Sequence, residues 1–514
     1  MWLPLAGAGL LVIGLLVGVT LEHSAAPAVE ITPMDDQSQS ARIGSIEEIL
    51  RYIEAKYVDE VNRESIVDGA INNLLAELDP HSNYISPTNL AGHKDQLNGT
   101  STGIGVDVLM IRDSVTVVNA LEAGPAAKAG ILPYDRIISI ADSVVSGQNQ
   151  TLAYVKSIFR TLPEGSVRLQ VYRPGQGELL PITLLPSEVI VPSVSEGLLL
   201  SEEVAYVHIR QFATDTYQQF MRQVERLVQD SAAKHLIIDL RGNSGGYLQE
   251  AVNVLSQLFP DEGRLLVYTE GEHSPRKEYN TSGRVFFSVE NVAVIIDNGT
   301  ASASEILAGA IQDWDRGLII GQRSFGKGLV QELYPLKNGG ALHITVARYF
   351  TPSGRSIQRD YEDLGAYRAG FDSLSPLAPK QYVTAAGRSV YGGGGISPDV
   401  KVSSVRRIDE PNFMKAKDAL EHFTFIELEL AKNVETEERL LIAFRKYLRD
   451  NNILLSDAQW TYYSAEVAQE LRVALTKKKQ GQEAADRLRI EQDPFVDEAL
   501  KAVLGKQLID RQNG

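Results

Sequence analysis

The sequence predicts an α/β core, preceded by a smaller β-rich module and flanked by helical regions at both ends of the chain. From Val204 onward, short apolar runs typical of buried strands alternate with stretches of helical periodicity, a pattern that predicts α/β layers. Between about residues 90 and 186 the signals are instead short strands and turns, and after about Ser403 the periodicity is helical again. A chain of 514 residues exceeds what one hydrophobic core usually supports, so we expect about two to four domains.

The composition is that of an ordinary globular protein, and it excludes several kinds of function. Apolar residues make up 44% of the chain and charged residues 23%. The net charge of −16 argues against a nucleic-acid partner, because phosphate binding needs a basic surface. Cysteine is absent, which excludes disulfides, thiolate zinc sites and thiol nucleophiles. Since no paired histidine and carboxylate spacing indicates a metal site either, we expect no cofactor.

The N-terminus carries an apolar, uncharged run at residues 2–21, which is about as long as a helix needs to cross a bilayer. A cleavable signal peptide is the alternative, because small residues follow at 25–28. A buried core helix is a third interpretation, which so uninterrupted a terminal run disfavours. We therefore expect residues 1–24 to be a transmembrane anchor or a signal peptide, and the protein to be exported.

A linker and a helical region are predicted next. Residues 25–41 are polar and rich in Ala, Pro, Ser and Gln, which is typical of a linker. Ser45 and Glu48 have the spacing of a capping box, and the apolar residues between and after them share one helical face. A second helix is predicted to end before Pro80, because proline cannot continue it. Together these signals predict a helical N-terminal region over residues 42–87.

The β-rich module is predicted to span residues 88–186. Its size, about a hundred residues, is that of an independent domain. Strands are expected just after residue 106 and at 115–118, 137–140 and 167–171, and helices at about 125–130 and 152–159.

The α/β core is predicted to span residues 187–402, followed by a helical C-terminal region over residues 403–514. In the C-terminal region one helical face is predicted to carry Leu440, Phe444, Tyr447 and Leu448. In the core, strands are expected at 204–209, 236–240, 265–268, 292–296, 318–320 and 341–349, and helices at 216–228 and 303–312.

The sharpest chemical signal in the sequence is Ser302. A predicted buried strand at 292–296 runs into a tight glycine-containing turn, and a helix begins directly after this serine. At a helix N-terminus the macrodipole and the free N–H groups stabilise developing negative charge, so a serine there has the geometry to attack a carbonyl. The alternative is that Ser302 or Ser304 merely caps the helix, as serine commonly does, and the motif alone favours this alternative.

A second signal is Lys327, which lies between Gly326 and Gly328. The two glycines permit close backbone approach and a partly enclosed amine. A serine hydroxyl needs a base, and a desolvated lysine with a lowered pKa can act as one, as in known Ser–Lys pairs. A solvated lysine in a surface turn is the alternative. A phosphate-binding loop is disfavoured, because Leu329 stands where Ser or Thr would be needed.

A third signal is the glycine-rich loop at residues 239–246, which directly follows another predicted buried strand. Such a loop can present backbone N–H groups to an oxyanion, although a plain strand-to-helix turn is the alternative. Histidine supplies no clear rival base. His208, His235 and His343 lie in or beside predicted strands, where a structural role is favoured. His81 lies in a proline-bounded loop and could be functional, but local hydrogen bonding is favoured.

Read together, the motifs between residues 43 and 402 resemble those of the carboxy-terminal processing peptidases, also called tail-specific proteases. The matching segments, in order, are 78–84, 103–106, 124–130, 239–246, 299–305, 325–328, 345–354 and 395–399. Each motif alone is weak, but their order makes the resemblance specific. The chain departs from the family pattern at Ser244, where Pro or Gly is usual, and at Tyr134, where Gly is usual. Neither departure removes a catalytic group.

The resemblance implies a Ser–Lys catalytic site. It implies that Ser302 is the nucleophile, that Lys327 is the general base, and that Gln331 supports the lysine. It further implies an oxyanion hole made by the backbone N–H groups of Gly246 and Ala303.

The resemblance also implies the fold and the mode of substrate binding. The core should be a crotonase/ClpP-like α/β fold, in which Asp313 gives structural support rather than catalysis. Residues 88–186 should be a PDZ domain, in which Ile104, Gly105 and Val106 receive the substrate's C-terminal carboxylate by β-augmentation.

The implied function is that of a serine endopeptidase that cleaves proteins near or from their C-termini and acts on exposed apolar tails. The implied location is the bacterial cell envelope, on the periplasmic side, either membrane-anchored or secreted. The helical C-terminal region could pack on the core, form a homo-oligomer contact or bind an adaptor, and the sequence assigns it no specific role. Two alternatives stay open, because a fold does not fix a function: a non-catalytic PDZ scaffold with a protease-like core, and a crotonase-like enzyme acting on an acyl thioester.

Overall fold

The computed structural model describes residues 37–505, except for gaps at 112, 122–123, 161, 163–164, 175, 231–232, 364–366, 368–379, 403–414, 417–418, 421, 425–435 and 481. The chain divides into two compact units, Met1–Ala70 and Ile71–Gly514. The predicted anchor or signal peptide and residues 25–36 of the predicted linker lie outside the described residues. Among the helices of the described part, none is long and apolar enough to cross a membrane.

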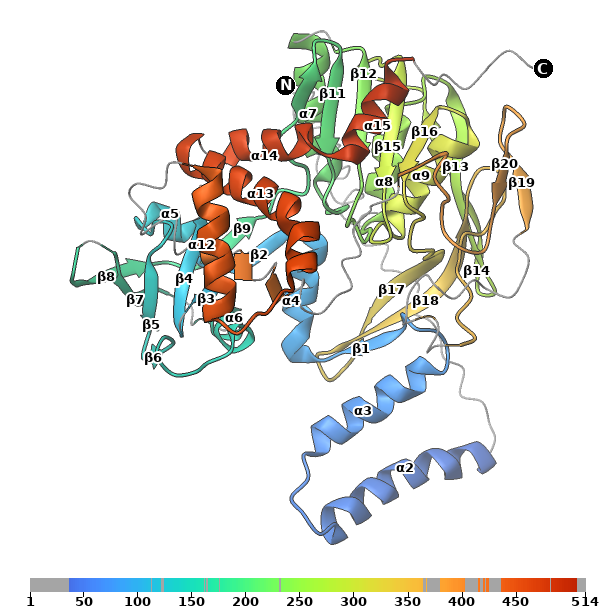
Figure 1. Cartoon of the computed structure of the whole chain (residues 1–514). Helices are drawn as coiled ribbons and strands as arrows, with labels where there is room; N and C mark the ends of the chain where they lie inside the picture. Colours follow the sequence, from blue (N-terminus) through green and yellow to red (C-terminus); the bar gives the residue numbers. More distant parts are fainter. Residues whose placement is uncertain are drawn as a thin grey trace, which may run out of the picture. The chain divides into compact units, whose positions relative to one another are not determined.

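The N-terminal helices are α2 (Gln37–Lys56) and α3 (Arg63–Ala76) (Figure 1). The prediction of a linker is wrong for residues 37–41, because α2 already includes them. Ser45 accordingly lies inside α2 and does not begin it. The Gln, Ala and Arg residues that precede this serine are good helix formers, so the helix extends beyond the capping-box spacing.

A six-stranded sheet forms the centre of the second unit. All neighbouring strands pair in parallel except the first two, which pair antiparallel. The inner strands are mostly apolar and rich in Val, Ile, Leu and Ala, as expected for strands that are buried on both faces. In spatial order the strands are β10 (Leu198–Ser201), β11 (Val204–His208), β12 (His235–Asp239), β15 (Asn291–Ile296), β16 (Gly317–Gly321) and β21 (Val400–Lys401).

Helices cover both faces of this sheet (Figure 1). On one face α7, α8 and α9 share a hydrophobic core with alternate residues of the strands. On the other face the last helix, α15, shares a second core with the intervening residues. The predicted α/β layers are therefore confirmed. The covering helices are α7 (Thr216–Glu225), which continues as η1 (Arg226–Asp230), α8 (Leu248–Ser256), α9 (Ala303–Asp313) and α15 (Pro494–Val503).

A second sheet lies beside the central one in the same unit, with the order β1-β18-β13-β14 and with β17 also paired to β18. Strand β17 begins two residues after Lys327, so this sheet positions the lysine loop. Its strands are β1 (Asn83–Ile85), β13 (Glu262–Gly271), β14 (Ser274–Ser282), β17 (Leu329–Pro335) and β18 (Ala341–Phe350). A hairpin of β19 (Gln381–Val383) and β20 (Ser389–Tyr391) follows in the chain.

The β-rich module has its own hydrophobic core, in which Val115, Ile137 and Leu169 are fully buried. Its main sheet has the order β3-β4-β5-β7-β8, so β3 is an edge strand. The predicted strands and both predicted helices are present. The elements are α4 (Pro87–Asn98), β2 (Thr100–Gly103), β3 (Val106–Ile111), β4 (Ser114–Ala120), α5 (Pro125–Lys128), β5 (Arg136–Ile140), β6 (Ser143–Val144), α6 (Leu152–Arg160), β7 (Val167–Tyr172), β8 (Leu179–Leu184) and β9 (Ser187–Ile190).

The C-terminal region is helical, as predicted, but its parts pack differently. Helices α12 (Glu437–Asp450) and α13 (Asp457–Gln480) share a small core in which Leu440, Phe444 and Leu448 are buried. These three residues therefore share a face, as their spacing predicts. Helix α14 (Gln482–Glu491) then leads to α15, which belongs to the central sheet.

Candidate active site

Ser302 lies where the loop after β15 enters α9. Its backbone has φ 55° and ψ −118°, a conformation that non-glycine residues rarely adopt and that is often found at functional sites. Although Ser302 occupies the N-cap position, its side chain makes no capping hydrogen bond, because the Glu305 N–H donates to the Ser302 carbonyl at 2.8 Å. Ser302 thus keeps the position and spacing of a capping residue, but the Glu305 N–H has an acceptor other than the hydroxyl.

A single buried carboxylate, that of Glu305, joins the serine turn to the lysine loop. Glu305 is fully buried and accepts hydrogen bonds from the backbone N–H groups of Ser302 at 2.9 Å, Gly326 at 2.7 Å and Lys327 at 2.9 Å. The Ser324 hydroxyl donates to it at 2.5 Å. Burial raises the pKa of Glu305 to about 7, against these hydrogen bonds, which favour the charged form.

The importance of Glu305 was missed in the sequence. The available signal was its position three residues after Ser302, which is the spacing of a capping box. The glutamate side of such a box is made by the bond that it accepts from the backbone N–H of the serine. The other acceptor sites of the carboxylate bind a loop about twenty residues away, and local spacing cannot indicate that contact.

The Lys327 amine is held by Gln331. Lys327 Nζ donates to Gln331 Oε1 at 2.7 Å, and Gln331 Nε2 donates to the His81 carbonyl at 2.7 Å. Because the second bond fixes which end of the amide is the oxygen, Gln331 presents an acceptor to the lysine. Burial lowers the pKa of Lys327, and the negative charges of Asp79 and Glu305 oppose this shift.

The loop at residues 79–82 supports this contact. Asp79 is buried and accepts from the backbone N–H of His81 at 2.8 Å, the backbone N–H of Ser82 at 2.9 Å and the Ser82 hydroxyl at 2.6 Å. The His81 ring contacts the Tyr367 hydroxyl through Nε2 at 2.7 Å, and burial with the nearby Lys327 charge lowers the pKa of His81 to about 4. The backbone N–H of His81 thus bonds locally, but the prediction of local bonding is wrong for the ring, whose partner lies 286 positions away, and the carbonyl belongs to the site.

The glycine-rich loop reaches the same place as Ser302. A Cβ atom added to Gly245 would lie 2.7 Å from the Cβ of Ser302, and one added to Gly246 would lie 2.2 Å from the Phe212 carbonyl oxygen. A side chain at either position would clash with these atoms, so the packing requires glycine at both. Among the described residues, the N–H groups of Gly246 and Ala303 have no acceptor, so both can donate to an anion.

One pocket of about 600 Å³ brings most of the predicted residues together. Ser302, Ala303, Gly246, Lys327 and Gln331 all line it. Apolar side chains from α4, α8, α9 and β17 line it as well: Leu97, Leu248, Ile306, Leu329 and Leu333. Within the part of the chain that the structure describes, no hydrogen bond joins the Ser302 hydroxyl to the Lys327 amine. Ser244, one of the two departures from the family pattern, is exposed at the rim of this pocket.

Asp313 lies away from this pocket. It ends α9, which has 11 residues and is therefore about 16 Å long, whereas Ser302 precedes the other end. Asp313 and Arg355 are both about 1% exposed and form an ion pair of 2.8 Å between Oδ1 and Nη2. The Ser353 N–H also donates to Asp313 Oδ2 at 3.0 Å. These contacts suit the structural role that the resemblance implies.

Ile104, Gly105 and Val106 lie together where β2 gives way to β3. The carbonyls of Ile104 and Gly105 accept from Ala126 and Leu121, at 2.9 and 3.0 Å. Their own N–H groups have no acceptor within the described residues. Val106 begins β3, whose outer edge pairs with no strand of the described chain. This segment can therefore bind both a carboxylate and an extended peptide.

Sequence profiles match three successive parts of the chain. "Peptidase family S41" matches residues 203–363, "PDZ domain" matches 102–184, and "Activating protease CtpB N-terminal domain" matches 6–88.

Named relatives agree with these matches. The chain is 31% identical over 352 residues to the carboxy-terminal processing protease CtpB of Bacillus subtilis, covering 67% of this chain and 72% of that protein. It is 31% identical over 354 residues to a carboxy-terminal-processing protease of Bartonella bacilliformis, covering 68% and 80%. It is 30% identical over 318 residues to a chloroplastic C-terminal processing peptidase of Tetradesmus obliquus, covering 59% and 68%. The chain therefore belongs to the carboxy-terminal processing proteases of peptidase family S41, and it is a serine peptidase with a PDZ domain.

Proposed function

We propose that Ser302 and Lys327 form the catalytic dyad of an endopeptidase that cleaves proteins near or from their C-termini. The observation that carries this proposal is the shared pocket, which contains a serine hydroxyl without a capping bond, a lysine amine of lowered pKa, and two backbone N–H groups without acceptors. These are the nucleophile, the base and the oxyanion donors that acyl transfer requires.

Acylation begins with neutral Lys327. Its amine donates one N–H to Gln331 and keeps its lone pair for the Ser302 proton. As the proton moves to the lysine, the serine oxygen bonds to the scissile carbonyl carbon, and the carbonyl oxygen becomes an oxyanion that accepts from Gly246 and Ala303. The C–N bond then breaks, and the leaving amine takes the proton from the Lys327 ammonium.

Deacylation repeats these steps with water. Neutral Lys327 accepts a proton from a water molecule, whose oxygen attacks the acyl carbon of the Ser302 ester. The ester C–O bond breaks, the proton returns to the serine oxygen, and the new C-terminal carboxylic acid leaves. Gln331 keeps the amine oriented in both halves, because its own amide is fixed by the His81 carbonyl.

The PDZ domain selects the substrate tail in this proposal. The N–H groups of Ile104 and Gly105, which have no acceptor among the described residues, bind the terminal carboxylate, and the tail adds as a strand to the edge of β3 from Val106 onward. The leucine and isoleucine side chains of the active-site pocket favour apolar residues around the cleaved bond.

The remaining proposals concern organisation and location. We retain the predicted domains, with a crotonase/ClpP-like core: residues 42–87, 88–186, 187–402 and 403–514. Helix α15 belongs to the last of these regions by sequence but packs on the core. We propose a cell-envelope protease, since related carboxy-terminal processing proteases occur in the bacteria Bacillus subtilis and Bartonella bacilliformis. Periplasmic placement, anchoring through residues 1–24, and oligomer or adaptor contacts through the C-terminal helices are part of the same proposal. The relatives, which are named as proteases, give no support to the scaffold or thioester alternatives.

One experiment tests the dyad and the tail recognition separately. An unstructured protein substrate is prepared with a free or an amidated C-terminus, and products are identified by mass spectrometry. We expect the wild-type protein to cleave the free form about tenfold faster, and Ser302→Ala and Lys327→Ala to yield no product. Lys337→Ala, at an exposed lysine of the adjoining turn, is the control. Unchanged cleavage in either active-site variant refutes the dyad, and equal rates for the two substrates refute the tail recognition.

A further inference from the structure

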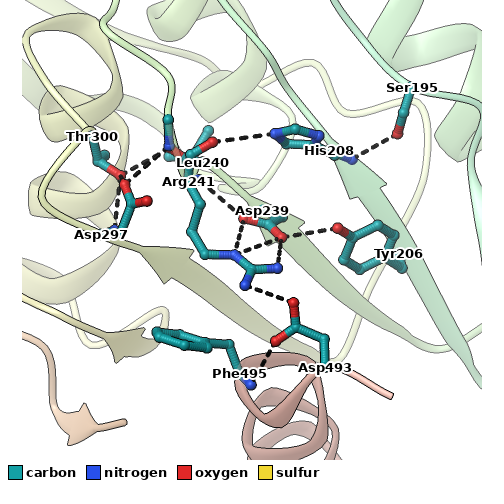
Figure 2. Close-up of polar contacts among 11 residues, drawn as sticks. Ser195, Tyr206, His208, Asp239, Leu240, Arg241, Asp297, Thr300, Asp493 and Phe495 are labelled. Atoms are coloured by element: carbon teal, nitrogen blue, oxygen red, sulfur yellow. Dashed lines mark hydrogen bonds and ion pairs between the residues drawn. The ribbon is translucent and has the colours of Figure 1, made fainter. Parts of the chain in front are cut away.

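The glycine-rich loop begins with a cluster of charged groups that the proposed mechanism does not use. Arg241 is the second residue of this loop after β12, and its guanidinium binds Asp239, from Nε to both carboxylate oxygens at 3.0 Å and from Nη2 to Oδ2 at 2.6 Å (Figure 2). Asp239 is 2% exposed, and the Tyr206 hydroxyl donates to its Oδ2 at 2.8 Å. Burial alone would raise the pKa of Asp239, but Arg241 overrides this effect and keeps the carboxyl charged.

The Nη1 atom of the Arg241 guanidinium binds a residue of the C-terminal region. Arg241 Nη1 donates to Asp493 Oδ2 at 2.7 Å, a contact between residues 252 positions apart in the chain (Figure 2). The other oxygen of Asp493 caps α15 by accepting from the Phe495 N–H at 2.9 Å. The Phe495 ring lies under the guanidinium, 5.0 Å from its carbon. The Asp493 side chain thus caps the N-terminus of α15 and also binds the glycine-rich loop.

The anchored loop is the one that carries the Gly246 N–H donor. Gly242 N–H donates to Asp297 Oδ1 at 2.9 Å, and the Thr300 hydroxyl donates to the Leu240 carbonyl at 2.8 Å (Figure 2). These bonds tie the start of the loop to the turn that leads into Ser302. Four residues of the same loop separate Arg241 from Gly246, so we expect the position of Arg241 to affect that of the donor.

The Arg241–Asp493 pair is partly shielded from solvent, unlike most ion pairs of the described chain. The two side chains are 22% and 20% exposed. Two other charged groups of α15, Asp497 and Lys501, form a pair that is 61% and 48% exposed. The first pair joins α15 to the glycine-rich loop, and removing one partner of a shielded pair leaves the other charge uncompensated, whereas the second pair lies within α15 and is exposed.

We infer that Asp493 is a positioning residue for the oxyanion hole: it holds Arg241, and through it the Gly246 N–H, at the place where the transition-state oxygen forms. The inference rests on the proposed roles of Ser302 and Gly246. It assigns to the end of the C-terminal region, which lies outside the segment matched to the peptidase family, a part in the chemistry of the core.

Asp493→Asn isolates this role from helix capping. Asparagine caps helices about as well as aspartate, so the bond to the Phe495 N–H is kept while the charge that holds Arg241 is lost. We expect kcat on an unstructured substrate to fall about tenfold with KM unchanged, and the affinity for a peptide aldehyde, which forms a hemiacetal oxyanion on Ser302, to fall by a similar factor. The melting temperature and the affinity for a cleaved product peptide should stay close to wild type.

Two further variants complete the test. Asp497→Asn, on the same helix, should match wild type in every measurement. Asp493→Glu keeps the charge and should recover most of the lost kcat. Should the asparagine variant fail to fold, a folded glutamate variant whose kcat and aldehyde affinity fall as far as those expected of the asparagine variant would overturn the inference.

The outcomes separate this inference from the proposed function. Wild-type kcat and aldehyde affinity in Asp493→Asn would overturn the positioning role while leaving the dyad intact. A parallel fall in aldehyde affinity, product affinity and melting temperature would also overturn it, because that pattern indicates general loosening. Failure of the wild-type protein to cleave or to bind the aldehyde would instead overturn the proposed function.

Discussion

The catalytic loops and the PDZ domain both present a pair of backbone N–H groups without an acceptor among the described residues, but they support these groups in different ways. Gly246 and Ala303 come from two loops that a buried polar network joins to each other and to the lysine loop. Ile104 and Gly105 lie between β2 and β3, in a small domain with a hydrophobic core of its own, and next to the edge strand β3.

This difference in support matches the two anions that we expect these N–H groups to bind, a substrate carboxylate in the PDZ domain and an oxyanion at the catalytic loops. The terminal carboxylate of a substrate is present in the ground state, so a separable domain with a preformed loop can bind it. An oxyanion exists only near the transition state, and its stabilisation depends on donors that are fixed before the reaction. The comparison predicts that changes at the catalytic loops lower kcat, whereas changes in the PDZ loop raise KM.

The largest effect should come from Ser302→Ala. Without the nucleophile, kcat on an unstructured protein should fall by roughly 10⁴-fold or more, and binding of the substrate tail should be unchanged. Cleavage rates followed by gel, together with tail binding by fluorescence anisotropy, check both parts. Residual cleavage near the wild-type rate would show that the serine loop is not the catalytic region.

Glu305→Gln should be the next most damaging change. The amide would direct N–H donors toward some of the four groups that now donate to the carboxylate. Buried donors left without acceptors cost about 1–3 kcal/mol each. We expect kcat to fall roughly 10²-fold as Ser302 and Lys327 lose their common support. Glu332→Gln, at an exposed glutamate of β17, is the matched control and should be silent. A folded Glu305→Gln variant with normal kcat would contradict this explanation.

The pH dependence should report Lys327. A general base must be uncharged, so kcat/KM should rise as pH increases through the pKa of this lysine and then level off. Because burial lowers this pKa, the rise should be complete at a lower pH than an ordinary lysine would allow. Gln331→Ala should shift the midpoint and lower the plateau, because the amine loses its acceptor. A rate that does not change with pH across this range would argue against a lysine base.

The smallest effect should come from the PDZ loop. Gly105 has φ 73°, and a Cβ atom there would lie 3.3 Å from the Cα of Gly124, so Gly105→Val should distort the loop. We expect KM for a protein with a free tail to rise about tenfold, with kcat and the cleavage of short peptides unchanged. Gly147→Val is the control for backbone strain. Gly147 lies in the same domain and has a similar φ of 76°, but open space surrounds it. A fall in kcat for Gly105→Val alone would mean that the two regions are not separable.

Much of the fold could be predicted from the sequence, because alternation of apolar runs and helical periodicity is a local signal. The core strands, the β-rich module and the shared face of Leu440, Phe444 and Leu448 all followed from it. The packing of α15 on the central sheet did not, since periodicity identifies an apolar face but not its partner. The start of α2 was also missed, because polar residues of good helix propensity resemble a linker.

Prediction of the active site from the sequence has the same limit, because local patterns do not reveal distant contacts. Ser302 and Lys327 stood out because glycines and a helix start surround them, and the pocket that they share agrees with their predicted pairing. Glu305 and Asp493 act through contacts with residues far away in the sequence, so their spacing gave little indication of their contacts. Ser302 itself was ambiguous until its backbone angles and the Glu305 bonds were known, because a capping serine and a nucleophile have the same sequence context.

The central claim, that Lys327 activates Ser302, is tested most directly by the rate at which a fluorophosphonate labels the protein. The account predicts a single adduct on Ser302 by peptide mass spectrometry, with a labelling rate at neutral pH that falls about 10²-fold or more in Lys327→Ala and stays normal in Lys337→Ala. An adduct on another residue, or labelling of Lys327→Ala at the wild-type rate, would contradict it.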